Sequence, residues 1–209
     1  MRAAAAQEAL RMTRNRILPA LFAGVLAFIA AGGIASAAQN GPRRGEGENA
    51  AEIAAVLGAR ISPAEAVAAA EHAANGRAVK LSIEDEGGVR LYEVRVAAGN
   101  RMFTVKIDPS TGAVRATEAD GLVARLLDRE DRSELAALQR APTTLGQAIT
   151  AAERAAGGGR AVEAAWEGED AALGYEVEVT RDGAITRVLV DASTGQARLG
   201  DAGAHGGSR

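Results

Sequence analysis

Two acidic clusters are the first residues in this sequence that could do chemistry. Glu84-Asp85-Glu86 and Glu167-Gly168-Glu169-Asp170 stand at equivalent hairpins of an internal repeat, and grouped carboxylates can hold a hard cation such as calcium. Their spacing matches no calcium-binding loop, however, and the tips of hairpins are commonly acidic for solubility. We therefore interpret both clusters as solvated hairpin tips and predict no metal site there.

Two further carboxylates belong to a repeated Asp-x-Ser-Thr-Gly pattern, Asp108 to Gly112 and Asp191 to Gly195. Each segment could be an anion or metal site. The simpler interpretation is a tight turn, in which the Asp accepts hydrogen bonds from backbone amides of its own turn and the Gly takes a positive φ. We predict turns at both places.

The chain has two histidines, His72 and His205. Two separated histidines cannot assemble a zinc site without several more ligands. A Ser–His–Asp arrangement would need His72 supported by a buried acid, and the sequence has no nucleophile elbow or oxyanion motif. We expect both histidines to be surface residues. We predict no catalytic residue, no cofactor-binding residue and no metal ligand, so we expect a protein that is not an enzyme and has no cofactor.

Tyr92, Tyr175 and Trp166 could form an aromatic binding surface. The chain has only six aromatic residues, of which three are Phe. We therefore expect these three residues to anchor small cores, with each phenol reaching solvent or a turn.

Most of these residues lie in a segment that occurs twice, because residues 61–115 match residues 143–198. A period this long, with several elements inside it, indicates a duplicated small domain. Each copy begins with a helix start signal, Ser62-Pro63-Ala64-Glu65 or Thr144-Leu145-Gly146-Gln147. We expect Gly76 to end the first helix in a left-handed conformation and the Gly157–Gly159 run to end the second.

After each helix the apolar pattern changes to a period of two, which is typical of half-buried strands. Turn residues such as Gly87-Gly88 separate the strands and favour hairpins. The sequence therefore predicts three antiparallel strands in each copy, with one apolar face covered by the helix. The apolar strand positions are Val79, Leu81 and Ile83, Tyr92, Val94 and Val96, and Phe103, Val105 and Ile107 in the first copy, and Val162, Ala164 and Trp166, Tyr175, Val177 and Val179, and Val188 and Val190 in the second.

The predicted fold class is α+β, with two tandem small domains that each pack one helix on a three-stranded antiparallel meander and are joined by a helical linker. The predicted segments are 1–37, a signal peptide; 38–60, a linker with a short helix near 50–57; 61–116, repeat 1; 117–142, a helical linker, with helix over 118–140; 143–199, repeat 2; and 200–209, a disordered tail. A repeat this small is marginal alone, so we expect the linking helix and the two repeats to share an interface.

The N-terminus predicts the compartment. Four Arg residues precede an apolar stretch over 17–31, and the small residues that follow it end in Ala35-Ser36-Ala37. This is the pattern of a secretory signal peptide cleaved after Ala37. A retained signal anchor and a start at Met12 stay as alternatives. We expect a periplasmic or secreted protein that meets a membrane only through this segment, if it is uncleaved.

Charge and cysteine content exclude several classes of function. Residues 1–37 carry four Arg and one Glu, so their removal changes the net charge from −3 to −6. No basic stripe remains for a nucleic acid. The chain has no Cys, so neither disulfides nor thiol chemistry contribute.

The order of these elements resembles the PepSY domain. The resemblance rests on the Ala-rich helix starts at 66–70 and 148–152, on Tyr92-Glu93-Val94 and Tyr175-Glu176-Val177, and on the closing turns after Val105-Lys106-Ile107 and Val188-Leu189-Val190. This family occurs in propeptides of thermolysin-type secreted metallopeptidases and in many extracytoplasmic bacterial proteins. The resemblance implies an inhibitory or protein-regulating module. No peptidase follows, and no His-Glu-x-x-His motif is present, so inhibition would act in trans.

Three function classes follow from the sequence. The first is a non-catalytic envelope protein that binds another envelope or secreted protein, an exported peptidase being one candidate, through sheet edges that can accept a strand. The second is a structural or sensory module that binds a small ligand or a divalent cation between the repeats. A hydrolase dependent on His72 ranks last.

Overall fold

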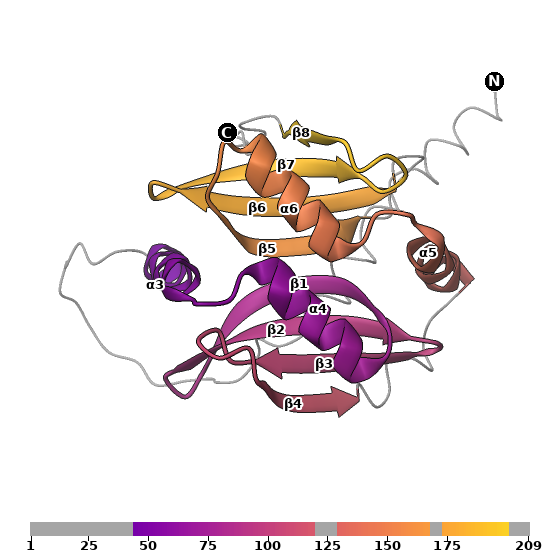
Figure 1. Cartoon of the computed structure of the whole chain (residues 1–209), viewed down its shortest axis with the longest axis horizontal. Helices are drawn as coiled ribbons and strands as arrows, with labels where there is room; N and C mark the ends of the chain where they lie inside the picture. The colour runs from indigo at the N-terminus through magenta and orange to yellow at the C-terminus, as the bar shows by residue number, and fades with distance from the viewer. Residues whose placement is uncertain (1–43, 120–128, 168–172, 201–209) are drawn as a thin grey trace, which may run out of the picture. The chain divides into compact units, whose positions relative to one another are not determined.

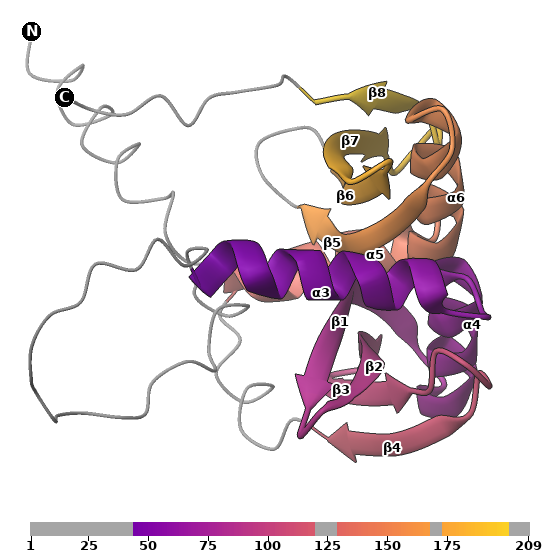
Figure 2. The ribbon, with the colours of Figure 1, turned by 90° about the vertical axis from the view of Figure 1, so that its left-hand side faces the viewer.

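The structure is a computed structural model that describes residues 44–119, 129–167 and 173–200. Its helices are α3 (Arg44–Gly58), α4 (Pro63–Ala74), α5 (Arg129–Arg140) and α6 (Leu145–Ala155). Helices α4 and α6 cover the same face of one sheet, whereas α3 and α5 lie at its two sides (Figure 1, Figure 2). The predicted signal peptide and residues 201–209 of the predicted tail lie outside the described residues, whereas the amide of Gly200 donates to the carbonyl of Arg187 at 2.8 Å.

The sheet contains eight antiparallel strands in the order β4-β3-β2-β1-β5-β6-β7-β8. The first copy supplies β1 (Arg77–Glu86), β2 (Val89–Ala98), β3 (Arg101–Ile107) and β4 (Val114–Ala119). The second copy supplies β5 (Arg160–Glu167), β6 (Gly174–Arg181), β7 (Ala184–Asp191) and β8 (Ala197–Leu199). The α+β class is confirmed.

The prediction of a three-stranded meander in each copy was wrong in two respects. A fourth strand follows each Asp turn, because the turn directs the chain back along β3 or β7. The two meanders also join, since β1 pairs with β5 through Lys80↔Ala165 and Leu81↔Ala164. We call this junction the seam. Period-two patterning missed β4 because almost every residue of this edge strand is exposed.

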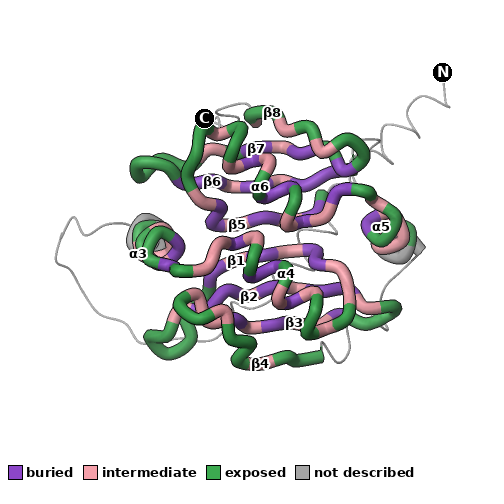
Figure 3. Tube along the Cα trace, in the orientation of Figure 1, coloured by how far each residue is buried: buried purple, intermediate pink, exposed green. Residues whose placement is uncertain are grey.

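A single row of apolar side chains crosses six strands and passes through the seam. Its members are cross-strand neighbours on the face that α4 and α6 cover, and all are fully buried. They are Val105, Val94, Leu81, Ala164, Val177 and Val188. Buried positions concentrate in the same central strands (Figure 3). The two repeats therefore share an interface, as predicted, but it is one continuous core and not a contact between two separate small cores.

Both cover helices begin with the predicted capping box. Ser62 and Glu65 cap α4, and Thr144 and Gln147 cap α6, each pair by reciprocal hydrogen bonds with the backbone. The prediction for the end of α4 was wrong by one residue, because Asn75 takes the left-handed conformation with φ 49°. Asn tolerates this conformation because its short polar side chain can hydrogen-bond locally. Gly157, in the run that ends α6, has φ 79° as expected.

The segment that precedes each cover helix also differs from the prediction. Helix α3 extends from Arg44 to Gly58, well beyond the short helix expected near 50–57. Residues 118–119, expected to be helical, end strand β4. Helix α5 runs from Arg129 to Arg140, within the helix expected over 118–140. The apolar residues of 120–128 lie outside the described residues.

No single helix of the described residues is long and apolar enough to cross a membrane. Ala50–Gly58 and Pro63–Ala74 together meet the criteria of length and composition, but they are bent by 81° where they meet.

Candidate functional site

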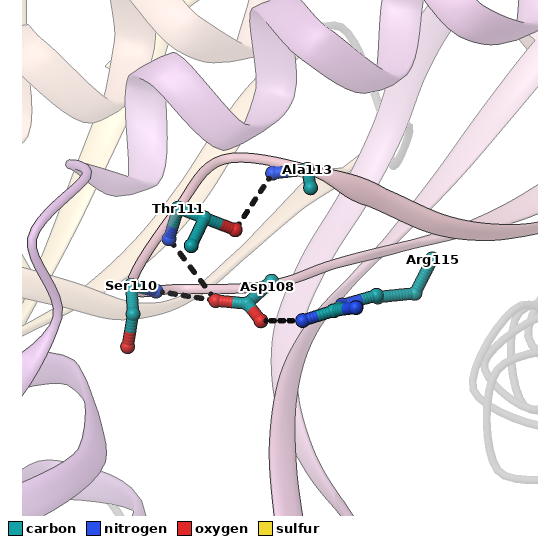
Figure 4. Close-up of polar contacts among 5 residues, drawn as sticks. All are labelled: Asp108, Ser110, Thr111, Ala113 and Arg115. Carbon is teal, nitrogen blue, oxygen red and sulfur yellow. Dashed lines mark hydrogen bonds and ion pairs between the residues drawn. The ribbon is translucent and has the colours of Figure 1, made fainter.

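The Asp-x-Ser-Thr-Gly segments are tight turns, as predicted. Asp108 Oδ1 accepts hydrogen bonds from the amides of Ser110 (2.8 Å) and Thr111 (3.0 Å), and its other oxygen accepts from Arg115 (Figure 4). The hydrogen bond from Arg115 is the main reason that the pKa of Asp108 falls to about 2. Gly112 closes the turn with φ 74°. These contacts occupy the carboxylate, so we assign the turn a structural role.

In the described ranges, the turn of the second copy lacks the arginine partner that the Asp108 turn has. Asp191 accepts from the amides of Ser193 (2.9 Å) and Thr194 (2.7 Å) and from the Thr194 hydroxyl. The amide of Thr194 is the main cause that lowers the pKa of Asp191. Arg198, which corresponds to Arg115, makes no ion pair with Asp191 among the described residues.

The acidic cluster of the first copy makes contacts within its own hairpin and with β3. Glu86 lies 2.5 Å from Lys106, and Asp85 accepts from the amide of Gly88 at 2.8 Å. Glu84 accepts from the Ser82 hydroxyl. Of the second cluster, residues 168–170 lie outside the described residues. In the part of the chain that the structure describes, no three His, Cys, Asp or Glu side chains are placed to hold a metal ion.

The remaining candidate residues divide into surface and core. His72 is exposed on α4, and His205 lies outside the described residues. Tyr92 and Tyr175 are fully buried, with 0% and 1% exposed, and Trp166 is 5% exposed. Trp166 packs edge-on against Tyr175, with ring centroids 5.2 Å apart. The three aromatic residues therefore anchor the core, as predicted, and form no exposed binding surface.

The hydroxyl of each tyrosine donates a hydrogen bond to a backbone carbonyl just before α6 or α4, the two helices that cover the sheet. Tyr175 donates to the carbonyl of Thr143 at 2.8 Å, and Tyr92 donates to that of Ile61 at 3.4 Å. Burial raises the pKa of Tyr92 to about 12, and the nearby Arg160 opposes that rise. Burial also raises the pKa of Tyr175, opposed by Arg77.

The same two carbonyls accept hydrogen bonds from arginines of the opposite copy. Arg77 donates to Thr143 (2.8 Å) and Ala141 (2.6 Å). Arg160 donates to Ile61 (3.1 Å) and also to carbonyls at the end of α3. Arg77 and Arg160 are equivalent residues that begin β1 and β5, so the two copies exchange reciprocal contacts across the seam. We call these contacts the arginine clamps.

A carboxylate of each cover helix fixes the start of its own strand. Glu71 accepts from the amide of Ala78 at 2.9 Å, and Glu153 accepts from that of Ala161 at 3.0 Å. Burial raises the pKa of Glu153. These equivalent bonds tie each helix to the strand that carries the arginine, so they position the clamps.

A groove of about 480 Å³ lies between the two cover helices. Ala64, Ala68 and Glu71 of α4 line it, together with Gly146, Thr150 and Arg154 of α6. The groove is open and mostly apolar. It lies where the hypothesis of a ligand site between the repeats would place one.

Comparison with known proteins assigns the family. The family model described as "Peptidase propeptide and YPEB domain", PepSY, matches residues 60–118 and 144–198. The chain belongs to the PepSY family. The two PepSY matches together span more than half of the sequence and coincide with the two copies, which confirms the resemblance seen in the sequence.

Other comparisons add little to the PepSY assignment. A crystal structure described as that of a "putative lipoprotein" from Clostridium difficile 630 is 21% identical. The match covers 62% of this chain and 85% of that one, with a TM-score of 0.37. A similarity at this level carries no argument about function. The search of curated proteins found no match.

Sequence reasoning missed the arginines, although the repeat contained their signal. Arg77 and Arg160 align with each other in the two PepSY repeats, directly after the glycines that follow each helix. Their partners could not be predicted, because those partners are backbone carbonyls of the other repeat.

Proposed function

We propose that this chain is a non-catalytic exported protein that binds another protein of the cell envelope and restrains an exported peptidase in trans. The PepSY assignment supports a regulatory role toward a peptidase, because the family is described by its occurrence in peptidase propeptides. Among the described candidate residues, Asp108 and Asp191 accept hydrogen bonds in turns, Tyr92 and Tyr175 are buried in the core, and His72 is exposed on the surface. We therefore base the proposal on the sheet edge and not on these residues.

The observation that carries the proposal is the exposed edge strand β4. Among the described strands, β4 pairs with β3 alone, and five of its six residues are exposed. An edge strand presents unpaired backbone N–H and C=O groups that can bind an extended segment of another protein. Six residues span roughly 20 Å, which is long enough for such pairing. The opposite edge, β8, has only three residues.

Site-specific cross-linking in cells tests this mode of binding. A photo-reactive residue at Thr117, exposed in β4, should capture one defined protein. The same residue at Asp182, exposed in the β6–β7 turn, should not. Equal capture at both positions, or none at Thr117 in a folded chain, would contradict binding at this edge.

A peptidase assay tests the regulatory part separately. Residues 38–209, added to the captured peptidase, should lower its rate of hydrolysis, and Thr117→Pro should relieve the inhibition because Pro removes a backbone donor. Leu199→Pro, at the opposite edge, is the matched control, because Leu199 and Val188 form a non-hydrogen-bonded pair and the Leu199 amide faces away from β7. Full activity of the peptidase with saturating unmodified chain would exclude inhibition.

The groove between α4 and α6 favours one second candidate, a sensory module that binds a small ligand between the repeats. Its volume suits a small molecule. It suits a hard cation less, since calcium takes six to eight oxygen ligands and Glu71, the carboxylate that lines the groove, already accepts from Ala78. A ligand present at 100-fold its Kd should add about 2.7 kcal/mol to the stability. Thermal melts with and without calcium, and then with a small-molecule panel, test this candidate.

A further inference from the structure

The helix that precedes each PepSY repeat packs on the other repeat. Helix α3 precedes repeat 1 but contacts β5 as well as β1, and α5 precedes repeat 2 but contacts β1. Val56 of α3 and Leu138 of α5 are equivalent residues and are both fully buried, at 0% and 1% exposed. Ala59 and Ala141 then make the same backbone bond, to Val56 and Leu138 respectively. The repeating unit therefore includes its leading helix.

We propose that the seam is a noncovalent recognition surface in its own right. The N-terminal half (44–119) binds the C-terminal half (129–200) through the two arginine clamps and the exchanged leading helices. The same surface accepts the matching half of a second copy of this chain. The partner class is thus a PepSY repeat with its leading helix.

The arginine clamps are the polar part of this surface. Arg160 donates to the carbonyls of Val56 (3.3 Å) and Ala59 (3.0 Å), at the end of α3, and to Ile61. Arg77 makes the matching bonds to Ala141 and Thr143, just after α5. A cation is favourable at the C-terminal end of a helix, where carbonyls lack partners within the helix. Each half therefore supplies one arginine and receives one.

Side chains contribute more to the seam than the backbone ladder does. The β1–β5 ladder has two paired positions, whereas β1 and β2 pair along almost their whole length. Lys80 of β1 adds an ion pair with Glu163 of β5 at 2.7 Å. Leu81 and Ala164 join the fully buried row from either side. A two-residue ladder alone would specify its register weakly, so the clamps and the leading helices supply the specificity.

The reciprocity of the contacts explains why a second copy fits. The two halves present equivalent arginines, acceptor carbonyls and leading helices to each other, much as the two subunits of a two-fold symmetric dimer do. They differ at Lys80 and its equivalent Glu163, whose ion pair favours pairing of an N-terminal half with a C-terminal half. None of the seam contacts described above involves residues 120–128, which connect the halves along the chain. Each half is small enough to be marginal alone, so exposing the seam is costly and pairing is favoured.

Cleavage of the folded full chain tests the proposal. A specific protease site placed within 120–128 is cut under native conditions, and the products are analysed by size-exclusion chromatography with light scattering. The halves should elute together at the mass of the uncut chain. An isotope-labelled cut copy is then incubated with an unlabelled cut copy whose C-terminal half carries an affinity tag, and exchange should place labelled N-terminal half on the tagged half. Halves that separate after cleavage, or that stay together but never exchange, overturn the proposal.

Arginine variants test whether the clamps determine the affinity between the two halves. Arg77→Ala and Arg160→Ala should each weaken the affinity between the cut halves roughly tenfold or more, since each loses hydrogen bonds from a charged donor. Arg101→Ala, which removes an arginine that stacks on Phe103 in β3, is the matched control and should leave the affinity unchanged. If the Ala variants do not fold, Arg77→Lys and Arg160→Lys retain the charge but lose the planar fork, and they should weaken the affinity less. An affinity equal to that of the unmodified halves in these variants would contradict the clamps.

Discussion

Tyr92 and Tyr175 occupy equivalent positions in the two PepSY repeats, but their phenols bind the backbone with different geometry. Tyr175 donates to Thr143 at 2.8 Å, whereas Tyr92 donates to Ile61 at 3.4 Å. Both carbonyls also accept from an arginine, so neither loses every partner when a tyrosine is replaced.

Tyr175→Phe should therefore destabilise the protein more than Tyr92→Phe. A net hydrogen bond contributes about 1 kcal/mol, and we expect about that loss for Tyr175→Phe. The longer bond of Tyr92 should contribute about half as much. Urea unfolding of both variants measures the difference in the free energy of unfolding. A larger loss for Tyr92→Phe would show that the 3.4 Å contact is the stronger one.

The buried phenols also predict the response to alkaline pH. The pKa of Tyr92 is about 12 in the folded state, above the value near 10 of an exposed tyrosine. A raised pKa means that the stabilising contribution is fully present below pH about 10 and is lost as the pH rises through about 12.

Phenolate absorbance tests this response directly, because the chain contains only two tyrosines. In Tyr175→Phe, the one remaining tyrosine should ionise near pH 12 or together with unfolding. The same variant in urea should titrate near pH 10 and serves as the control. Ionisation near pH 10 in the folded protein would show that Tyr92 is exposed to solvent.

Sequence signals that depend on near neighbours predicted the local structure. They did not predict the contacts across the seam. The capping boxes, the period-two strands and the Asp turns depend on neighbours within a few residues, so Ser62, Tyr92 and Asp108 could be placed from the sequence. Strand β4 could not, because its exposed residues do not alternate. The arginine clamps could not either, because the carbonyls that accept from Arg77 lie more than sixty residues away in the chain. The groove between α4 and α6 likewise depends on how the two repeats dock.

The Asp108 turn predicts an acid-dependent loss of stability. The pKa of Asp108 is lowered to about 2, mainly by the hydrogen bond from Arg115. A lowered pKa means that its stabilising contribution is present above the unfolded value, near 3.9, and is lost as the pH falls through about 2. In Asp108→Asn, the decline of stability between pH about 4 and 2 should be shallower.

NMR titration of the Asp108 carboxyl tests whether Arg115 lowers the pKa of Asp108. Arg115→Ala should raise the pKa of Asp108, since it removes the largest contribution that lowers it. Arg198→Ala, at the equivalent position of the second repeat, should leave the pKa of Asp191 unchanged, because the amide of Thr194 is the main cause there. An unchanged pKa of Asp108 in Arg115→Ala would show that the backbone amides suffice.

Gly76 predicts a steric cost at the junction between α4 and β1. A Cβ atom added there would lie 2.5 Å from the carbonyl oxygen of Ala97 and 2.8 Å from Val96 Cγ1. The backbone of β2 cannot move aside without breaking its pairing with β1, because Arg77 faces Ala97 in the ladder. Gly76→Ala should therefore cost about 1–3 kcal/mol, the range for overpacking a close contact.

Gly58→Ala is the matched control for this substitution. A Cβ atom at Gly58, the last residue of α3, meets nothing within 4 Å, and Ala restricts the unfolded chain more than Gly does. This variant should be neutral or slightly more stable. Chemical unfolding of both variants gives the comparison, and a Gly76→Ala protein as stable as Gly58→Ala would mean that α4 can shift away from β2. Because Arg77 follows Gly76 directly, such a shift should also weaken the clamp to Thr143.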